Sequence, residues 1–255
     1  MLPSASAAAW PLFFLLTLSC ILLFSSYIVV HFLSRDASSW ENEVTFFYLA
    51  PPAARAGIHA HWVAGTVIML LIPLQLLRSV RRSVPCLHRA SGRVILLSSL
   101  PLCGGGFAYI FSRGTTGGPS MSASFTLYGG LVLFAAFKTF RSAVPLRSDK
   151  SDSLVESHRR WASRLATLLL GSGLFRLMVA LGLLVVLPDY VYDRDEDLGA
   201  VKKLLNVVAW LYYPLPLAAT ELYLRRTKPA PAPVTRRESR VPILLRSSIP
   251  GLDSL

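Results

Sequence analysis

Residues 164–187 read RLATLLLGSGLFRLMVALGLLVVL, and this stretch decides the class of fold. It exceeds the length of about 20 residues that a helix needs to cross the hydrocarbon core of a bilayer. Apart from Arg164 and Arg176, it contains no charged residue. A run this long and this apolar predicts a transmembrane helix rather than a core helix of a soluble domain.

Five more stretches approach or reach the same length: residues 11–33, 58–77, 94–112, 122–140 and 204–224. Hydrophobic residues make up 53% of the 255 residues and charged residues only 16%, which excludes an ordinary soluble domain of this length. The first stretch has no basic leader and is too long for the core of a signal peptide, so we expect it to be retained. The sequence therefore predicts an all-α integral membrane bundle of about six transmembrane helices.

Successive connections between the predicted helices alternate between few and many lysine and arginine residues. The dense segments follow the second, fourth and sixth helices, with five basic residues from Arg78 to Arg93, seven from Lys138 to Arg164 and seven after Leu224. Basic connections are retained on the cytoplasmic side of a membrane. We therefore expect the N-terminus and the C-terminus both to lie on the cytoplasmic side.

These features divide the chain into four parts. Residues 1–57 hold the first transmembrane helix and an outer loop, and residues 58–187 hold the core helical bundle. Residues 188–226 hold an acidic outer loop and the last transmembrane helix; the loop lacks the regular spacing of a calcium site. Residues 227–255 form a basic, proline-rich cytoplasmic tail that we expect to be disordered.

The net charge of +12 is first of all a signal of topology. Because the basic residues are concentrated in three separated segments on the expected inner face, we predict contact with anionic lipids and no nucleic-acid partner. The three cysteines are odd in number and widely spaced, which indicates neither a disulfide framework nor a zinc site. The lipid bilayer is thus the predicted environment.

Two similar basic motifs each carry a histidine beside a predicted helix. His88 begins the motif HRASGR, which is expected to precede the third helix by several residues, and His158 begins HRRW before the fifth. The alternation of charge places both histidines at the inner face. A histidine at a membrane boundary can ligate haem iron, transfer a proton or contact a lipid phosphate. The motifs therefore predict a site at that face with several chemistries open.

His61 and Arg176 are ionisable residues within predicted helices. Such a side chain is costly inside a bilayer, so each is a candidate for function. Arg176 lies twelve residues beyond Arg164, about 18 Å along the helix, and should face the bundle interior toward an anionic or carbonyl partner. His61 lies near the outer end of the second helix, where His31 of the first helix is a possible partner.

The motifs also have a specific joint spacing over about residues 58–180. They are His61-x3-Gly65, Pro73 with Gln75, Pro85-x2-His88-Arg89-x2-Gly92-Arg93, His158-Arg159-Arg160-Trp161-x2-Arg164, and Arg176. This set resembles the predicted membrane proteins catalogued as domain of unknown function 2306. The resemblance implies a multi-pass helical bundle whose site residues are His61, His88, His158, Arg93, Arg164 and Arg176. It implies no activity, since none is assigned to that family.

The first of three functions that fit the sequence is a haem b protein that carries electrons across or within the bilayer through bis-histidine ligation. His88 and His158 would form the inner axial pair, with His61 as a further candidate ligand and His31 as a less favoured one. Arg93 or Arg176 would then pair with the haem propionates. This function implies a redox partner.

The second function is a membrane-embedded enzyme, such as a cyclase or isomerase, acting on a small lipophilic prenyl or quinone substrate. A histidine or Glu221 would act as acid or base in a pocket lined by aromatic residues such as Trp62, Tyr109, Phe175 and Trp210. The third is a non-catalytic transporter-like or scaffold bundle, whose histidine and arginine motifs anchor helices to lipid phosphates. The sequence alone leaves all three open.

Overall fold

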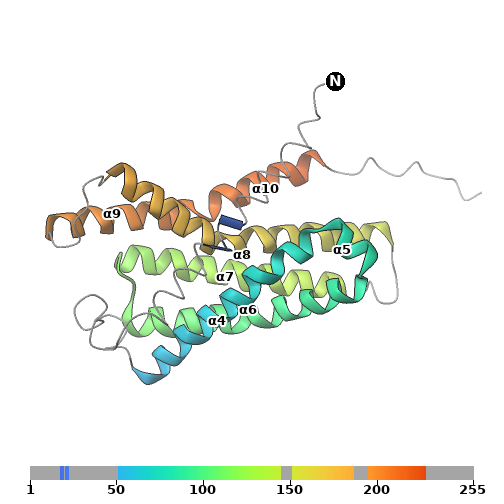
Figure 1. The fold of residues 1–255 in the computed structure, drawn as a ribbon, viewed down its shortest axis with the longest axis horizontal. Helices are drawn as coiled ribbons and strands as arrows, with labels where there is room; N and C mark the ends of the chain where they lie inside the picture. Colours follow the sequence, from blue (N-terminus) through green and yellow to red (C-terminus); the bar gives the residue numbers. More distant parts are fainter. Residues whose placement is uncertain (1–17, 20, 23–50, 145–150, 187–194, 228–255) are drawn as a thin grey trace, which may run out of the picture.

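The computed structural model describes residues 18–19, 21–22, 51–144, 151–186 and 195–227. These residues are almost entirely helical and include no strand, which confirms the all-α prediction (Figure 1). From residue 51 onward the helices are α4 (Pro52–Leu76), α5 (Arg78–Ser83), α6 (Pro85–Arg113), α7 (Pro119–Ala143), α8 (Asp152–Val186), α9 (Asp195–Leu211) and α10 (Pro214–Arg226).

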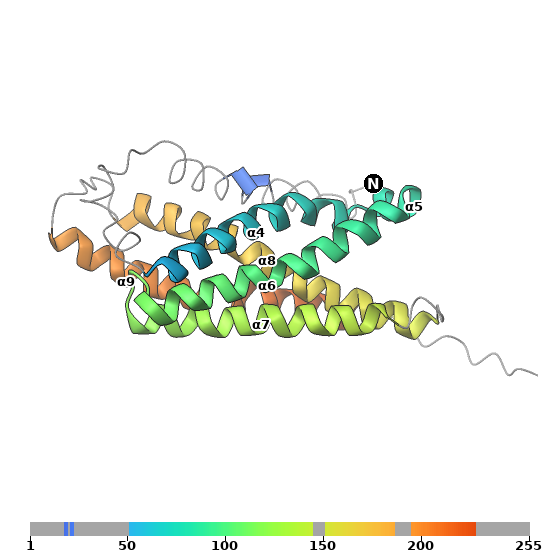
Figure 2. The same cartoon turned by 90° about the horizontal axis from the view of Figure 1, so that it is seen from below.

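Four long helices, α4, α6, α7 and α8, form an antiparallel bundle. Helix α6 lies between α4 and α7, and α8 packs against α7 and more lightly against α4 (Figures 1 and 2). The bundle core is apolar and includes Ile68, Ile72, Ile95, Leu102, Val132, Leu165, Leu168 and Leu169. Because neighbouring helices run in opposite directions, the end of α4 meets the start of α6, and the end of α7 meets the start of α8.

Helices α4 and α6 approach each other closely at a pair of glycines. A Cβ atom added to Gly105 would lie 2.0 Å from the carbonyl oxygen of Gly57, a distance that no side chain can occupy. Small residues at such a crossing let two helix backbones touch, which is a common way of packing helices in membranes. The Gly57–Gly105 crossing therefore fixes the position of α4 on α6.

Two helices begin earlier than the sequence predicted, and a proline explains one of these boundaries. Pro85 is in the first turn of α6, where its missing N–H leaves no helical hydrogen bond unmade. His88 therefore lies inside the helix, and the prediction that it precedes the helix by several residues is wrong. Helix α8 likewise begins at Asp152, so His158 lies within it. Both helices continue beyond their apolar stretches into their basic motifs.

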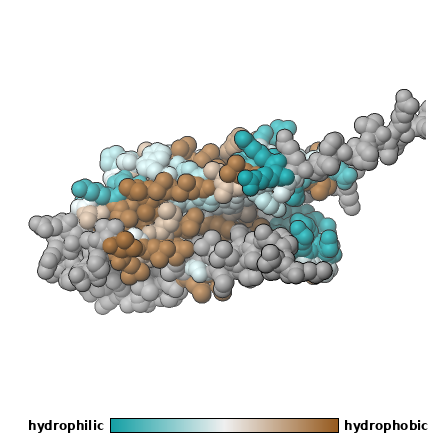
Figure 3. All heavy atoms as spheres, turned by 90° about the horizontal axis from the view of Figure 1, so that it is seen from above, coloured by the Kyte–Doolittle hydropathy of each residue, from teal (hydrophilic) through white to brown (hydrophobic). Residues whose placement is uncertain are grey.

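The outside of the bundle is rich in large apolar side chains. Figure 3 shows a broad apolar area along the described helices. Among the strongly exposed residues are Val63, Leu97, Leu100, Phe111, Leu181 and Leu184. A soluble protein rarely exposes so large an apolar surface. Four of the described helices, α4, α6, α7 and α8, are long and apolar enough to cross a membrane, and these features together indicate a membrane protein.

One end of the bundle, the basic end, collects the arginines that the sequence distributes over separate connections. It comprises the last turns of α4 and α7, the first turns of α6 and α8, and α5. Its basic residues include Arg78, Arg81, Arg82, Arg89, Arg93, Arg141, Arg159 and Arg160. The antiparallel fold thus gathers the dense connections at one end, as the charge alternation predicted, while their cytoplasmic placement stays a prediction.

The sequence predicted one helix over residues 204–224, and this is wrong. Helix α9 ends at Leu211 and α10 begins at Pro214, with Tyr212 and Tyr213 between them. Pro214 and Pro216 carry no N–H and cannot continue the hydrogen bonding of α9, which explains the interruption. Neither helix is among the four described helices that could cross a membrane.

Helix α9 is attached to the start of α7 by side-chain hydrogen bonds. Asn206 donates its Nδ2 hydrogen to the carbonyl oxygen of Gly117 at 2.7 Å, and Trp210 donates from Nε1 to Oγ of Ser120 at 3.1 Å. These contacts hold α9 beside the end of the bundle opposite the basic end.

Several predicted features lie outside the described residues. They are nearly all of the first predicted helix at residues 11–33, His31, the acidic residues 189 and 193, and the tail after residue 227.

Candidate functional site

The basic end has a cavity lined by all four long helices. Its volume is about 550 Å³, within the range of about 300–1,000 Å³ that is typical of small-molecule sites. His88 of α6 and His158 of α8 both line it, together with Gln75 of α4 and Thr139 of α7. The fold therefore brings the two histidine motifs of the sequence to one cavity, here named the His88–His158 cavity.

His158 is oriented by helix α7. Its Nδ1 atom lies 3.3 Å from the carbonyl oxygen of Thr139 and 3.3 Å from Oγ of Ser142. A carbonyl oxygen only accepts hydrogen bonds, so Nδ1 carries the hydrogen in its bond to Thr139. The neutral imidazole then has its lone pair on Nε2, which is the arrangement of a histidine that ligates a metal.

The backbone around His88 is held by Gln75. Nε2 of Gln75 donates hydrogen bonds to the carbonyl oxygen of His88 at 2.7 Å and to Oγ of the buried Ser91 at 2.6 Å. These bonds join the end of α4 to the start of α6. Nδ1 of His88 is itself buried and has no hydrogen-bond partner among the described residues. A buried polar nitrogen without a partner is costly, which marks this imidazole as a candidate to bind something in the cavity.

Of the arginines that the sequence singled out, Arg93 lines the His88–His158 cavity and Arg164 lines neither large cavity. Arg89, which the site prediction omitted although it adjoins His88, also lines the cavity. The cavity thus combines two imidazoles with two guanidinium groups at its edge.

Arg164 instead connects α8 to α10. It forms an ion pair with Glu221 in which Nε and Nη2 donate to the two carboxylate oxygens. Nη1 of Arg160 donates to the carbonyl oxygen of Leu224 at 3.0 Å. Both contacts lie on α10, so part of the HRRW motif has a structural role.

Trp161 of the same motif is in contact with two cations. The guanidinium of Arg164 is 4.6 Å from the centre of its ring, and Nζ of Lys138 on α7 is 5.3 Å from it. Such cation–π contacts stabilise helix pairs where water is scarce. Trp161 therefore links α7, α8 and the ion pair with α10.

We predict that Arg164 and Glu221 stabilise the protein as a unit. Arg164→Gln and Glu221→Gln should each lower the melting temperature, whereas the double variant should cost little more than either one, with a coupling of about 1 kcal/mol. Thermal unfolding of the three variants in detergent, followed by circular dichroism, measures this. Additive losses would show that the pair does not hold α10.

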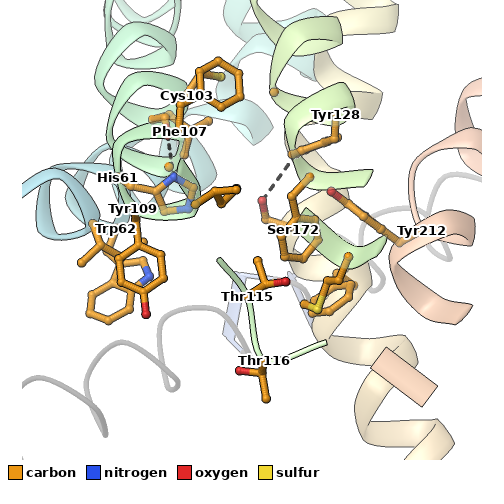
Figure 4. Close-up of a pocket in the computed structure, with 18 of the residues that line it drawn as sticks. His61, Trp62, Cys103, Phe107, Tyr109, Thr115, Thr116, Tyr128, Ser172 and Tyr212 are labelled. Atoms are coloured by element: carbon orange, nitrogen blue, oxygen red, sulfur yellow. Dashed lines mark hydrogen bonds between the residues drawn. The ribbon is translucent and has the colours of Figure 1, made fainter. Parts of the chain in front are cut away.

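A second cavity, of about 240 Å³, lies nearer the opposite end of the bundle (Figure 4). It is here named the His61 cavity. His61 of α4 and Arg176 of α8 line it, so the fold places these two predicted site residues together. Its other polar lining residues are Cys103, Tyr109, Thr115, Thr116, Tyr128, Ser172 and Tyr212. The interior position predicted for Arg176 agrees with this placement, and its Nη1 donates to the carbonyl oxygen of Ser172 at 3.0 Å.

An apolar layer separates the two cavities. Gln75 lies fourteen positions beyond His61 on α4, about 21 Å along the helix axis. Ile68, Val132 and Leu168 are almost fully buried at intermediate positions on three of the helices. The bundle thus has one cavity with some polar lining toward each end and buried apolar residues between them.

Sequence reasoning missed Thr139, Tyr128 and Ser172 as lining residues. The carbonyl oxygen of Thr139 orients His158, and the Tyr128 hydroxyl donates to the carbonyl oxygen of Leu168 at 2.6 Å beside the His61 cavity. No local motif marks these residues, since backbone carbonyl partners become apparent only when the helices are packed. Ser172 alone could have been found, because it lies one helical turn from Arg176 on α8.

No family model matches the chain, and comparison with curated proteins and with solved structures also finds no match. The functional argument therefore depends on the cavities themselves.

Proposed function

We propose that the chain is a multi-pass membrane protein of the family that its motifs resemble, and that it binds haem b between His88 and His158 for transfer of electrons. One observation carries the proposal: two histidines from different helices line one cavity of about 550 Å³ at the basic end. Ligands on facing helices are the usual way in which helical bundles hold a haem or metal.

The two available histidines suit the axial ligation of haem iron better than the binding of a metal ion that needs three protein ligands. Among residues that the structure describes, no group of three or more His, Cys, Asp or Glu side chains lies close enough to hold a metal ion. Haem iron needs two axial ligands at most, because the porphyrin supplies the others. His158, with Nδ1 bonded to Thr139, and His88, with Nδ1 buried and unbonded, fit that requirement.

The remaining lining residues would bind and shield the group. Arg89 and Arg93 would pair with the propionates at the edge of the cavity, while Ile72, Ile95, Leu165 and Leu169 exclude water. Haem supplies one-electron redox chemistry when it is bound. The basic end, with its exposed arginines, would face anionic lipid and a redox partner on the cytoplasmic side.

The absorption spectrum of the full chain tests this proposal. We expect the protein purified from a haem-supplied host to show a Soret band and, after reduction with dithionite, the sharp visible bands of a six-coordinate b-type haem. A preparation with a single folded species, an adequate supply of haem and no Soret band would contradict the proposal.

A non-catalytic bundle is the second candidate, and one observation favours it. Arg160, Trp161 and Arg164 contact α7 or α10, so these three motif residues already have structural partners. This function does not explain why both histidines line the same cavity. For the enzyme hypothesis, Trp62, Tyr109 and Phe175 line the His61 cavity together with His61, as that hypothesis expects. Glu221 is ion-paired with Arg164 and lines neither large cavity, so it is not the acid or base of such a pocket.

A further inference from the structure

The His61 cavity has the composition of a ligand site for one ring. Aromatic side chains form a large part of its wall, among them Trp62, Phe107, Phe125, Phe175 and Tyr212. Its volume of about 240 Å³ exceeds that of a cavity of about 150 Å³ that accommodates benzene. It is too small for a whole lipid. A single substituted ring fits these dimensions, with any attached chain leaving between the helices.

His61 contributes a hydrogen-bond acceptor to this cavity. Its Nδ1 atom bonds to the carbonyl oxygen of Leu102 on α6, and the dashed line from the ring in Figure 4 marks this bond. Because the carbonyl only accepts, Nδ1 carries the hydrogen, and the neutral ring keeps its lone pair on Nε2. The ring lines the cavity. A ligand that meets this nitrogen must therefore donate a hydrogen bond.

Hydroxyl groups lie across the cavity from His61, of which that of Tyr128 already donates to the carbonyl oxygen of Leu168 and that of Thr115 to the carbonyl oxygen of Gly118. Ser172 and Tyr128 are on its far side in Figure 4, with Thr115 between the two sides. Arg176 also lines the cavity, and its Nη1 donates to the carbonyl oxygen of Ser172, which places this strong donor on the Ser172 side. A ligand that spans the cavity therefore needs a hydroxyl at one end and an acceptor oxygen at the other.

We propose that the His61 cavity binds the ring of a lipid-soluble hydroquinone. One hydroxyl donates to Nε2 of His61, and the oxygen on the opposite side of the ring accepts from Arg176. The aromatic wall packs against the faces and edges of the ring. This site is about 20 Å from the His88–His158 cavity along the bundle, and its occupation does not depend on haem.

Calorimetric titration of the full chain in detergent with trimethylhydroquinone, kept reduced under nitrogen, tests the proposal. We expect saturable binding of one molecule per chain. The dimethyl ether of the same compound keeps the ring and both oxygens but has no hydroxyl hydrogen. It should bind at least about tenfold more weakly, since the His61 nitrogen is then left without a donor.

Two variants connect the binding to the cavity. Arg176→Gln should weaken trimethylhydroquinone binding by about tenfold or more, whereas Arg141→Gln, at an exposed arginine of α7 outside the cavity, should leave it unchanged. The comparison of ligands on the unaltered protein keeps the test valid if Arg176→Gln does not fold.

Three results would overturn the proposal. They are the absence of saturable binding to the unaltered chain, equal affinity for the hydroquinone and its dimethyl ether, and tighter binding of octanoate than of trimethylhydroquinone. The last result would assign the cavity to a lipophilic carboxylate. None of these results bears on the presence of a Soret band, so the two proposals fail separately.

Discussion

Gly105→Ala is expected to destabilise the protein more than a glycine-to-alanine substitution at any other described glycine of the bundle. The new Cβ would lie 2.0 Å from the Gly57 carbonyl oxygen and 3.1 Å from the backbone nitrogen of His61. These are backbone atoms, which cannot rotate away, so α4 must separate from α6. Overpacking of this kind costs about 3 kcal/mol, enough to lower the yield of folded protein sharply.

Gly104→Ala is the matched control for this substitution. Gly104 is the preceding residue of the same helix, and a Cβ there meets nothing within 4 Å. Alanine favours a helix over glycine by about 0.5–1 kcal/mol, so this variant should be as stable as the parent or more so. Thermal denaturation monitored by size-exclusion chromatography compares the two. Equal melting temperatures would contradict the close α4–α6 crossing.

The second large effect is expected at the two histidines of the His88–His158 cavity. His158→Ala and His88→Ala should each remove one axial ligand and lower the haem bound per chain by tenfold or more, because a single imidazole holds a b-type haem far less tightly than a pair does. The pyridine haemochrome assay on equal amounts of monodisperse protein gives this ratio directly.

His59→Ala serves as the control for these two variants. His59 is an exposed histidine of α4 that lines neither large cavity, so its replacement should leave the haem content as it is in the parent. If His88→Ala and His158→Ala retained as much haem as His59→Ala, any haem present would be bound elsewhere, and the proposed ligand pair would be wrong.

The sequence predicts the helical class well because the signal is local. Each of the four long helices contains an apolar stretch of the required length, and the alternation of basic residues predicts which ends meet. Helix ends were less predictable. The motif beginning at His88 is polar and was placed before the helix, although Pro85 is a known helix-starting signal. Pro214 and Pro216 similarly mark the interruption between α9 and α10.

The candidate sites were predictable only as sets of residues. The sequence predicts His61, His88 and His158 as site residues because an ionisable group in or beside a bilayer is costly and is therefore a candidate for function. The orientation of His158 by the Thr139 carbonyl and that of His61 by the Leu102 carbonyl depend on neighbours 19 and 41 residues away. Arg164 forms its ion pair with Glu221, which is 57 residues away in the sequence. The motif spacing could not reveal that partner and therefore predicted Arg164 as a site residue.

The most direct measurement of the central claim is the low-temperature electron paramagnetic resonance spectrum of the oxidised, purified full chain. The account predicts a low-spin ferric haem with two axial imidazoles, converted to a high-spin form or lost in His88→Ala and in His158→Ala. A high-spin haem in the unaltered protein, or a low-spin signal that persists in both variants, would contradict ligation by His88 and His158.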